Sequence, residues 1–355
     1  MNTDPALTAW PWAQPAWERT LASLGALHHG LLITGPPGIA KREFALALSQ
    51  TLLCADPASG RGACGRCRNC KLFNAATHPD FHVLTTEREW RDGRLRLTAE
   101  YCNRYQDISA REKRANPGQV ISVDQVRLLI ERFHAHAHTA LRKIALLMPA
   151  DRMNINAANA LLKLLEEPPA HSVLILVSAV PGYLPATIRS RCFQIKIPPP
   201  DLDTARAWLC GQMPEAPPEA RAEAEKALSS SGPADVLQMH ADGFLLHQAR
   251  LLRDTARLAN GQADALELAA QWIRHDFLRV LDFLHRLSGD LIKYACGVGG
   301  QAPLELRSRP LSTGKMFALY EQIGWYRKIA REPLNEQLAM EELLLALRDA
   351  LAARH

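Results

Sequence analysis

The chain lacks any apolar run of the about 18 residues that a membrane-spanning helix requires. Its N-terminus carries Asp4 and Pro5 where a secretory leader would have a basic segment followed by an apolar one. The net charge is only +5, and lysine and arginine are spread along the chain instead of forming one phosphate-binding patch. We therefore expect a cytoplasmic protein that is neither membrane-inserted nor a DNA-binding protein of the polybasic type.

A phosphate-binding loop is present, but two of its defining residues are missing. Gly35 and Lys41 stand at the right spacing, after a short apolar run and before a helical pattern. Ala40 replaces the second glycine, and Arg42 replaces the hydroxyl residue that would bind Mg²⁺. A guanidinium only donates hydrogen bonds, so it cannot be a metal ligand. The loop, with Gly38 inside it, is therefore expected to be a degenerate nucleotide site.

The acidic residues that would bind Mg²⁺ and activate water are missing as well. In P-loop nucleotidases they follow a second buried strand, which is predicted here at 143–147. Met148 and Pro149 come next, and neither side chain can bind Mg²⁺ or accept a proton. Asp151 lies further along, where we expect it to cap a helix or stabilise a turn. Two independent defects in one site predict that the chain has no intrinsic ATPase activity.

Several stretches resemble the AAA+ domain of DNA sliding-clamp loaders, and one resembles the last helix of the collar domain of that family. They are residues 34–38, 147–153, 159–169, 188–192 and, for the collar helix, 335–345. Within the family, the broken loop, the missing acidic pair and the intact Ser190-Arg191-Cys192 triplet resemble a subunit that does not hydrolyse ATP. The resemblance implies that Arg191 acts in trans, as an arginine finger on ATP bound only by a neighbouring subunit.

The same resemblance implies partners and a process. The chain would be a scaffold in the clamp loader of bacterial DNA polymerase III, and part of a nucleotidyltransferase by association only. Its partners would be the ATPase subunits (gamma/tau), the delta subunit and, through the complex, the sliding clamp and primer-template DNA. In the ATPase subunits a sensor arginine lies in the second domain, whereas the corresponding stretch here, 231–236, contains no arginine.

Cysteine spacing predicts a metal site. Two residues separate Cys64 from Cys67 and Cys67 from Cys70, and Cys54 precedes them by nine intervening residues. Four thiolates complete the tetrahedral shell of one Zn²⁺ ion per chain, and a full shell has no place for water, so the zinc would be structural. A [4Fe–4S] cluster suits the same spacing and remains the alternative.

We predict an α/β AAA+ P-loop domain over 1–197, with a parallel sheet, a zinc module at 54–70 and an insertion at 87–118. Its strands are expected at 31–34, 81–84, 143–147, 173–177 and 193–197. The insertion mixes both charge signs and reads as a solvated loop or short hairpin. A small helical lid domain is expected at 198–243, after three consecutive prolines, and a helical collar or oligomerisation domain at 244–355.

Two other functions remain open at this stage. One is an active AAA+ ATPase, against which the missing acidic pair and Arg42 argue. The other is a zinc-ribbon protein that binds nucleic acid on a degenerate scaffold. It would need a basic face beside the cysteines, where the sequence has four cations, Arg61, Arg66, Arg68 and Lys71. Four local charges are too few to decide for that function.

Overall fold

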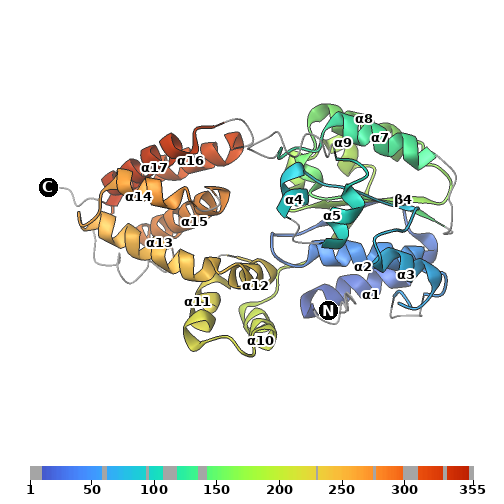
Figure 1. Ribbon diagram of the computed structural model, residues 1–355, viewed down its shortest axis with the longest axis horizontal. Helices are drawn as coiled ribbons and strands as arrows, with labels where there is room; N and C mark the ends of the chain where they lie inside the picture. Colours follow the sequence, from blue (N-terminus) through green and yellow to red (C-terminus); the bar gives the residue numbers. More distant parts are fainter. Residues whose placement is uncertain are drawn as a thin grey trace. The chain divides into compact units, whose positions relative to one another are not determined.

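The computed structural model describes residues 10–57, 62–92, 96–106, 118–134, 142–228, 231–274, 277–298, 311–330 and 334–351. The chain divides into two compact units (Figure 1). The first comprises residues 1–214 and 231–237, and the second comprises residues 215–230 and 238–355. The boundaries predicted at 197 and 243 remain predictions.

Five parallel strands form the centre of the first unit, in the order β2-β3-β4-β1-β5. They are β1 (Gly30–Thr34), β2 (Phe81–Leu84), β3 (Lys143–Leu147), β4 (Ser172–Ser178) and β5 (Phe193–Lys196). Every residue of β1 to β4 is buried, as expected for apolar runs covered on both faces. The edge strand β5 is exposed at three of its four positions. All five predicted strands are confirmed.

Helices cover both faces of this sheet, with α7, α8 and α9 on one face and α1, α2 and α3 on the other (Figure 1). Their buried sides follow the helical period. In α7, for example, Val126, Leu129 and Phe133 face the core. The helices and single turns of the unit are η2 (Pro11–Ala13), α1 (Gln14–Ala22), η3 (Leu24–Ala26), α2 (Lys41–Leu53), α3 (Arg68–Asn74), α4 (Glu87–Asp92), α5 (Arg96–Cys102), α7 (Val123–His134), η4 (Ala150–Arg152), α8 (Ile155–Glu166), η5 (Pro181–Tyr183), α9 (Ala186–Arg189) and α10 (Leu202–Gln212).

The loop or hairpin predicted for the insertion at 87–118 is wrong for its described part, which contains the helices α4 and α5. Trp90 and Tyr101 of these helices are buried. The Tyr101 hydroxyl accepts a hydrogen bond from the His78 amide at 3.1 Å and donates to the Phe73 carbonyl at 3.2 Å. The mixed charges suggested a solvated surface, but the aromatic residues among them fasten this segment to β2 and α3.

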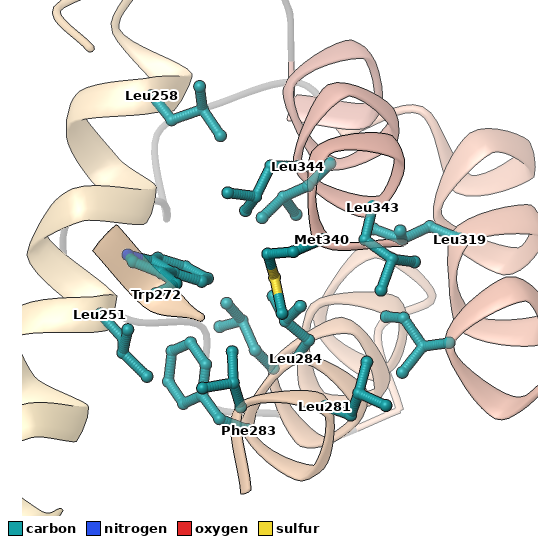
Figure 2. Close-up of a cluster of buried hydrophobic side chains, with 14 of the residues drawn as sticks. Leu251, Leu258, Trp272, Leu281, Phe283, Leu284, Leu319, Met340, Leu343 and Leu344 are labelled. Atoms are coloured by element: carbon teal, nitrogen blue, oxygen red, sulfur yellow. The ribbon is translucent and has the colours of Figure 1, made fainter. Parts of the chain in front are cut away.

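The second unit is helical throughout its described residues, as predicted for the C-terminal part of the chain. Its helices are α11 (Pro218–Leu228), α13 (Phe244–Ala259), α14 (Ala265–Trp272), α15 (Phe277–Ala295), α16 (Thr313–Ile329) and α17 (Glu336–Leu351), and α12 (Pro233–Ala241) connects the two units in sequence. Figure 2 shows its core, in which Trp272 of α14, Leu284 of α15 and Met340 of α17 point toward one another. Each fully buried side chain of this size contributes about 1.5–3 kcal/mol. In the parts of the chain described here, no helix is long and apolar enough to cross a bilayer.

Candidate functional site

The degenerate phosphate loop keeps the backbone shape of its motif. It follows β1 directly and ends at Lys41, where α2 begins. Ala40 adopts the left-handed conformation, with φ 64° and ψ 28°, at the position where the complete motif has its second glycine. A residue with a Cβ pays roughly 1–2 kcal/mol in that conformation. The strand, loop and helix predicted from the sequence are therefore present, and one strained residue preserves the turn.

Lys41 is turned into its own loop. Its side chain is buried, and its Nζ donates a hydrogen bond to the Pro36 carbonyl. Burial lowers the pKa of this ammonium to about 8, although the nearby Asp235 carboxylate acts in the opposite direction. The cation that would meet the terminal phosphates of a nucleotide thus has a partner within the chain.

Arg42, at the position of the missing hydroxyl, forms an ion pair with Glu89 of α4. The other carboxylate oxygen of Glu89 accepts a hydrogen bond from the Thr85 hydroxyl at 3.0 Å. Both partners are partly buried, with side-chain exposures of 34% and 26%. The pair connects the start of α2 to the insertion, and sequence reasoning missed Glu89 because it lies far along the chain.

The segment 231–237 lies directly on the phosphate loop. The Ala234 amide donates to the Gly38 carbonyl at 2.9 Å. A Cβ on Gly232 would lie 2.4 Å from the Pro37 carbonyl oxygen, and a Cβ on Gly38 would lie 2.6 Å from an oxygen of Asp235. Two glycines therefore permit this contact. It places a carboxylate, in a segment without arginine, beside the loop.

Three indoles pack against one another, and one of them is hydrogen-bonded to the loop. Trp12 is buried and its Nε1 donates to the Ile39 carbonyl at 3.0 Å. Trp10 stacks on Trp208 of α10 with ring centroids 4.6 Å apart, and Trp12 meets Trp208 edge to face at 5.4 Å. These contacts fasten the segment before α1 to the loop and to α10. No periodic pattern in the sequence indicated that Trp10 and Trp208 would meet.

The end of β3 carries no acidic pair. Met148 is buried there. Asp151 lies inside the turn η4, as one of its two expected roles required, but it does not cap a helix: α8 is capped by Asn154, whose side chain accepts from the Ala157 amide. The Asp151 carboxylate instead accepts a hydrogen bond from the Ser178 hydroxyl, at the end of β4, at 2.6 Å. Its use is structural in this arrangement.

The four predicted cysteine ligands come together. Cys54 follows α2, Cys67 is the N-cap of α3 and Cys70 lies in its first turn, while Cys64 lies in the connecting loop. All four Sγ atoms lie within 4.8 Å of one another, and those of Cys54 and Cys67 are 3.8 Å apart. A tetrahedral ion with Zn–S bonds of about 2.3 Å requires sulfurs about 3.8 Å apart, so the cluster fits zinc.

Backbone amides support the sulfurs of this cluster. The amides of Cys64, Cys67 and Cys70 donate to the sulfurs of Cys54, Cys64 and Cys67 at 3.3, 3.3 and 3.4 Å. Burial acts to raise the pKa of the Cys67 thiol. Hydrogen bonds outweigh burial, with the bond from the Cys70 amide as the largest of them, and lower this pKa to about 6. These bonds favour the thiolate of Cys67, the form that binds a metal, whereas burial raises the pKa of the Cys54 and Cys70 thiols in the same cluster.

Arg191 lies at the turn between α9 and β5. Its Nη2 is 2.8 Å from Oε1 of Glu166, at the end of α8, and its Nη1 donates to the Thr187 carbonyl at 3.1 Å. The solvent-exposed fraction of its side chain is 39%. Arg191 therefore makes a salt bridge within its own chain, while the Nε of Arg189 is buried without a hydrogen-bond partner among the described residues.

Known proteins resemble this chain over most of its length. Residues 15–201 match the sequence model of the family described as DNA polymerase III, delta subunit. The Pseudomonas aeruginosa protein named DNA polymerase III subunit delta' is 37% identical over 74% of this chain and 71% of its own length. The protein of the same name from Yersinia pestis is 29% identical over 97% of this chain and 96% of its own length.

The Escherichia coli protein of that name is 37% identical over 56% of this chain and 52% of its own length. Within the clamp-loader family, the broken loop, the missing acidic pair and the intact triplet at Arg191 predict the delta' subunit rather than an ATPase subunit. The relatives confirm this narrower prediction. The chain belongs to the DNA polymerase III delta' subunit family.

Proposed function

We propose that this chain is a non-hydrolysing subunit of the clamp loader, which places the sliding clamp on primer-template DNA during replication. Its task there is to support the assembly and to supply Arg191 to ATP bound by a neighbouring gamma/tau ATPase subunit. The observation that carries the proposal is a partly exposed Arg191 on a chain whose phosphate-loop lysine binds a carbonyl of its own loop and whose Arg42 pairs with Glu89. The delta subunit would be its other direct partner.

The loop geometry argues against hydrolysis by the chain itself. The Lys41 ammonium is bound to a loop carbonyl, Arg42 is paired with Glu89, and the Asp235 carboxylate lies against Gly38. A nucleotide would have to displace the lysine and accept a negative group beside its phosphates, without a hydroxyl or acidic residue to bind Mg²⁺. Gly35, Gly38 and Lys41 are thus the remains of a binding site.

Arg191 has the properties that an arginine finger needs. A guanidinium stays charged at all physiological pH values and offers a planar set of donors that matches phosphate oxygens. The residue lies beside the edge strand β5, where Phe193 is 57% exposed. An exposed aromatic residue next to an unpaired strand edge favours contact with another protein. In related phosphoryl-transfer systems an arginine supplied in trans raises turnover by about 10³-fold or more.

Zinc is the metal that we propose for Cys54, Cys64, Cys67 and Cys70. With four thiolates the shell is full, and a bound zinc ion would cross-link the end of α2 to the start of α3. The Asn69 side chain supports the same junction by donating to the Leu53 carbonyl at 2.8 Å. The role of this centre is therefore structural.

The test is Arg191→Ala in a clamp loader reconstituted with gamma/tau and delta, with Arg206→Ala on α10 as the matched control. Arg206 is exposed, and among the described residues its ion pair is the local one with Asp203. We expect both variants to assemble, and only Arg191→Ala to lose ATP turnover stimulated by the clamp and DNA. Equal turnover in the two variants would refute the arginine-finger role and leave only the proposed role as a scaffold. Failure of the wild-type chain to join the complex would remove the proposal as a whole.

A further inference from the structure

We propose that Glu166 holds Arg191 back: it binds the guanidinium to its own subunit until the phosphates of the neighbouring nucleotide compete for it. This inference rests on the proposed role of Arg191 and concerns the regulation of the same residue. It makes Glu166 a positioning residue whose removal should raise, and not lower, the rate at which Arg191 acts.

The geometry of the pair supports a resting contact. The guanidinium is held from two sides, by Glu166 Oε1 at 2.8 Å and by the Thr187 carbonyl at 3.1 Å. The contact to Thr187 lies within the same helix end, one turn before Arg191. The contact to Glu166 instead comes from another helix, so it fixes the direction in which the side chain points.

The two ends that carry the pair are seated on the start of β1. The His29 Nε2 is 2.8 Å from the carbonyl of Leu165, which precedes Glu166. A Cβ on Gly30 would lie 2.9 Å from the Leu165 side chain and 3.1 Å from the Arg191 carbonyl oxygen. The backbone around both charged residues is therefore closely packed, and rotation of the two side chains is enough to separate the pair.

The pair is exposed enough to be exchanged for a stronger one. The solvent-exposed fractions of the Arg191 and Glu166 side chains are 39% and 49%. Exposed pairs of this kind bias an equilibrium by only about one and a half- to five-fold, and salt weakens them. The triphosphate of a nucleotide carries several charges and more acceptor oxygens than one carboxylate, so it should win the competition once it is within reach.

The experiment compares Glu166→Gln with Glu167→Gln in the reconstituted clamp loader. Glu167 is the exposed neighbour, so its substitution removes the same charge without touching the pair. Single-turnover ATP hydrolysis isolates the step in which Arg191 would act. We expect Glu166→Gln to be faster than the wild type by up to about five-fold at low salt, with a smaller excess near 1 M salt, where the screening length of about 3 Å is close to the 2.8 Å separation of the pair. Glu167→Gln should match the wild type.

Each outcome decides one point. If Arg191→Ala loses turnover but Glu166→Gln equals Glu167→Gln, the restraint is refuted while the arginine finger stands. If Glu166→Gln loses turnover, Glu166 orients Arg191 for the reaction. The proposal that Glu166 slows the action of Arg191 is then refuted. If Arg191→Ala has no effect, the proposed function fails and the restraint fails with it. A Glu166→Asp variant, which keeps the charge, should lie between the wild type and Glu166→Gln.

Discussion

Replacing Gly232 by alanine should separate the segment 231–237 from the phosphate loop. The new Cβ would lie 2.4 Å from the Pro37 carbonyl oxygen and 2.5 Å from the carbonyl carbon and oxygen of Gly38. These are backbone atoms, so the two segments have to move apart by about 1 Å to reach ordinary contact. Overpacking of this kind costs about 1–3 kcal/mol. Losing the hydrogen bond from Ala234 to Gly38 adds about 1 kcal/mol, for a total of roughly 2–4 kcal/mol.

Gly211→Ala is the matched control for this substitution. Gly211 lies inside α10, is exposed, and has no described atom within 4 Å of its ideal Cβ position. There the same change should stabilise the chain by about 0.5–1 kcal/mol, because alanine favours the helix. Denaturant unfolding should show a lower unfolding free energy for Gly232→Ala and a higher one for Gly211→Ala. Hydrogen exchange of the amides in 35–40 and 231–237 should show faster exchange in Gly232→Ala alone. Equal unfolding and equal exchange in the two variants would refute the described contact.

Three further predictions concern the phosphate loop and the cysteine cluster. The isolated chain should hydrolyse ATP no faster than a mock preparation, and Lys41→Ala should leave that background unchanged; a rate abolished by the substitution would contradict the closed loop. Elemental analysis of protein purified without chelators should find one zinc per chain, which Cys67→Ser loses together with stability around α3 while Cys210→Ser, at an exposed cysteine, keeps both. Because burial lowers the pKa of Lys41 to about 8, the folded state binds fewer protons than the unfolded state between pH 8 and 10.5. The unfolding free energy of the wild type should therefore rise relative to Lys41→Met across this range, and a flat or falling difference would argue against a buried ammonium.

The sequence predicted what local patterns encode. Four of the strands are short, mostly apolar runs and the edge strand β5 alternates apolar and polar residues, so all five positions could be predicted within a residue or two. The cysteine cluster could be predicted because ligand spacing is itself a geometric signal. Ala40 and Arg42 predicted a degenerate loop because they replace the glycine and the Mg²⁺-binding hydroxyl of the motif, and this remains a prediction. Each of these features depends on a few neighbouring residues.

The contacts that the sequence did not predict join residues far apart in the chain. Nothing near Arg42 indicates that Glu89 will be its partner, because the two are brought together by α4, whose helix the mixed charges concealed. Arg189 and Arg191 are only two residues apart, and the sequence does not show which of them an acidic residue will contact. The packing of α8 against α9 decides that Glu166 meets Arg191. These pairings require the tertiary structure.

A phosphate loop that binds no nucleotide, as we propose for this subunit, would also make the subunit insensitive to the ratio of ATP to ADP in the cell. A ligand shifts a conformational equilibrium only as far as it binds one state better than another. If the loop binds no nucleotide, as we propose, the first unit has no such ligand there, and its conformational ensemble should not follow the ratio of ATP to ADP. In the proposed assembly, such a chain would serve as a constant support, and the nucleotide-dependent steps would be confined to the ATPase subunits.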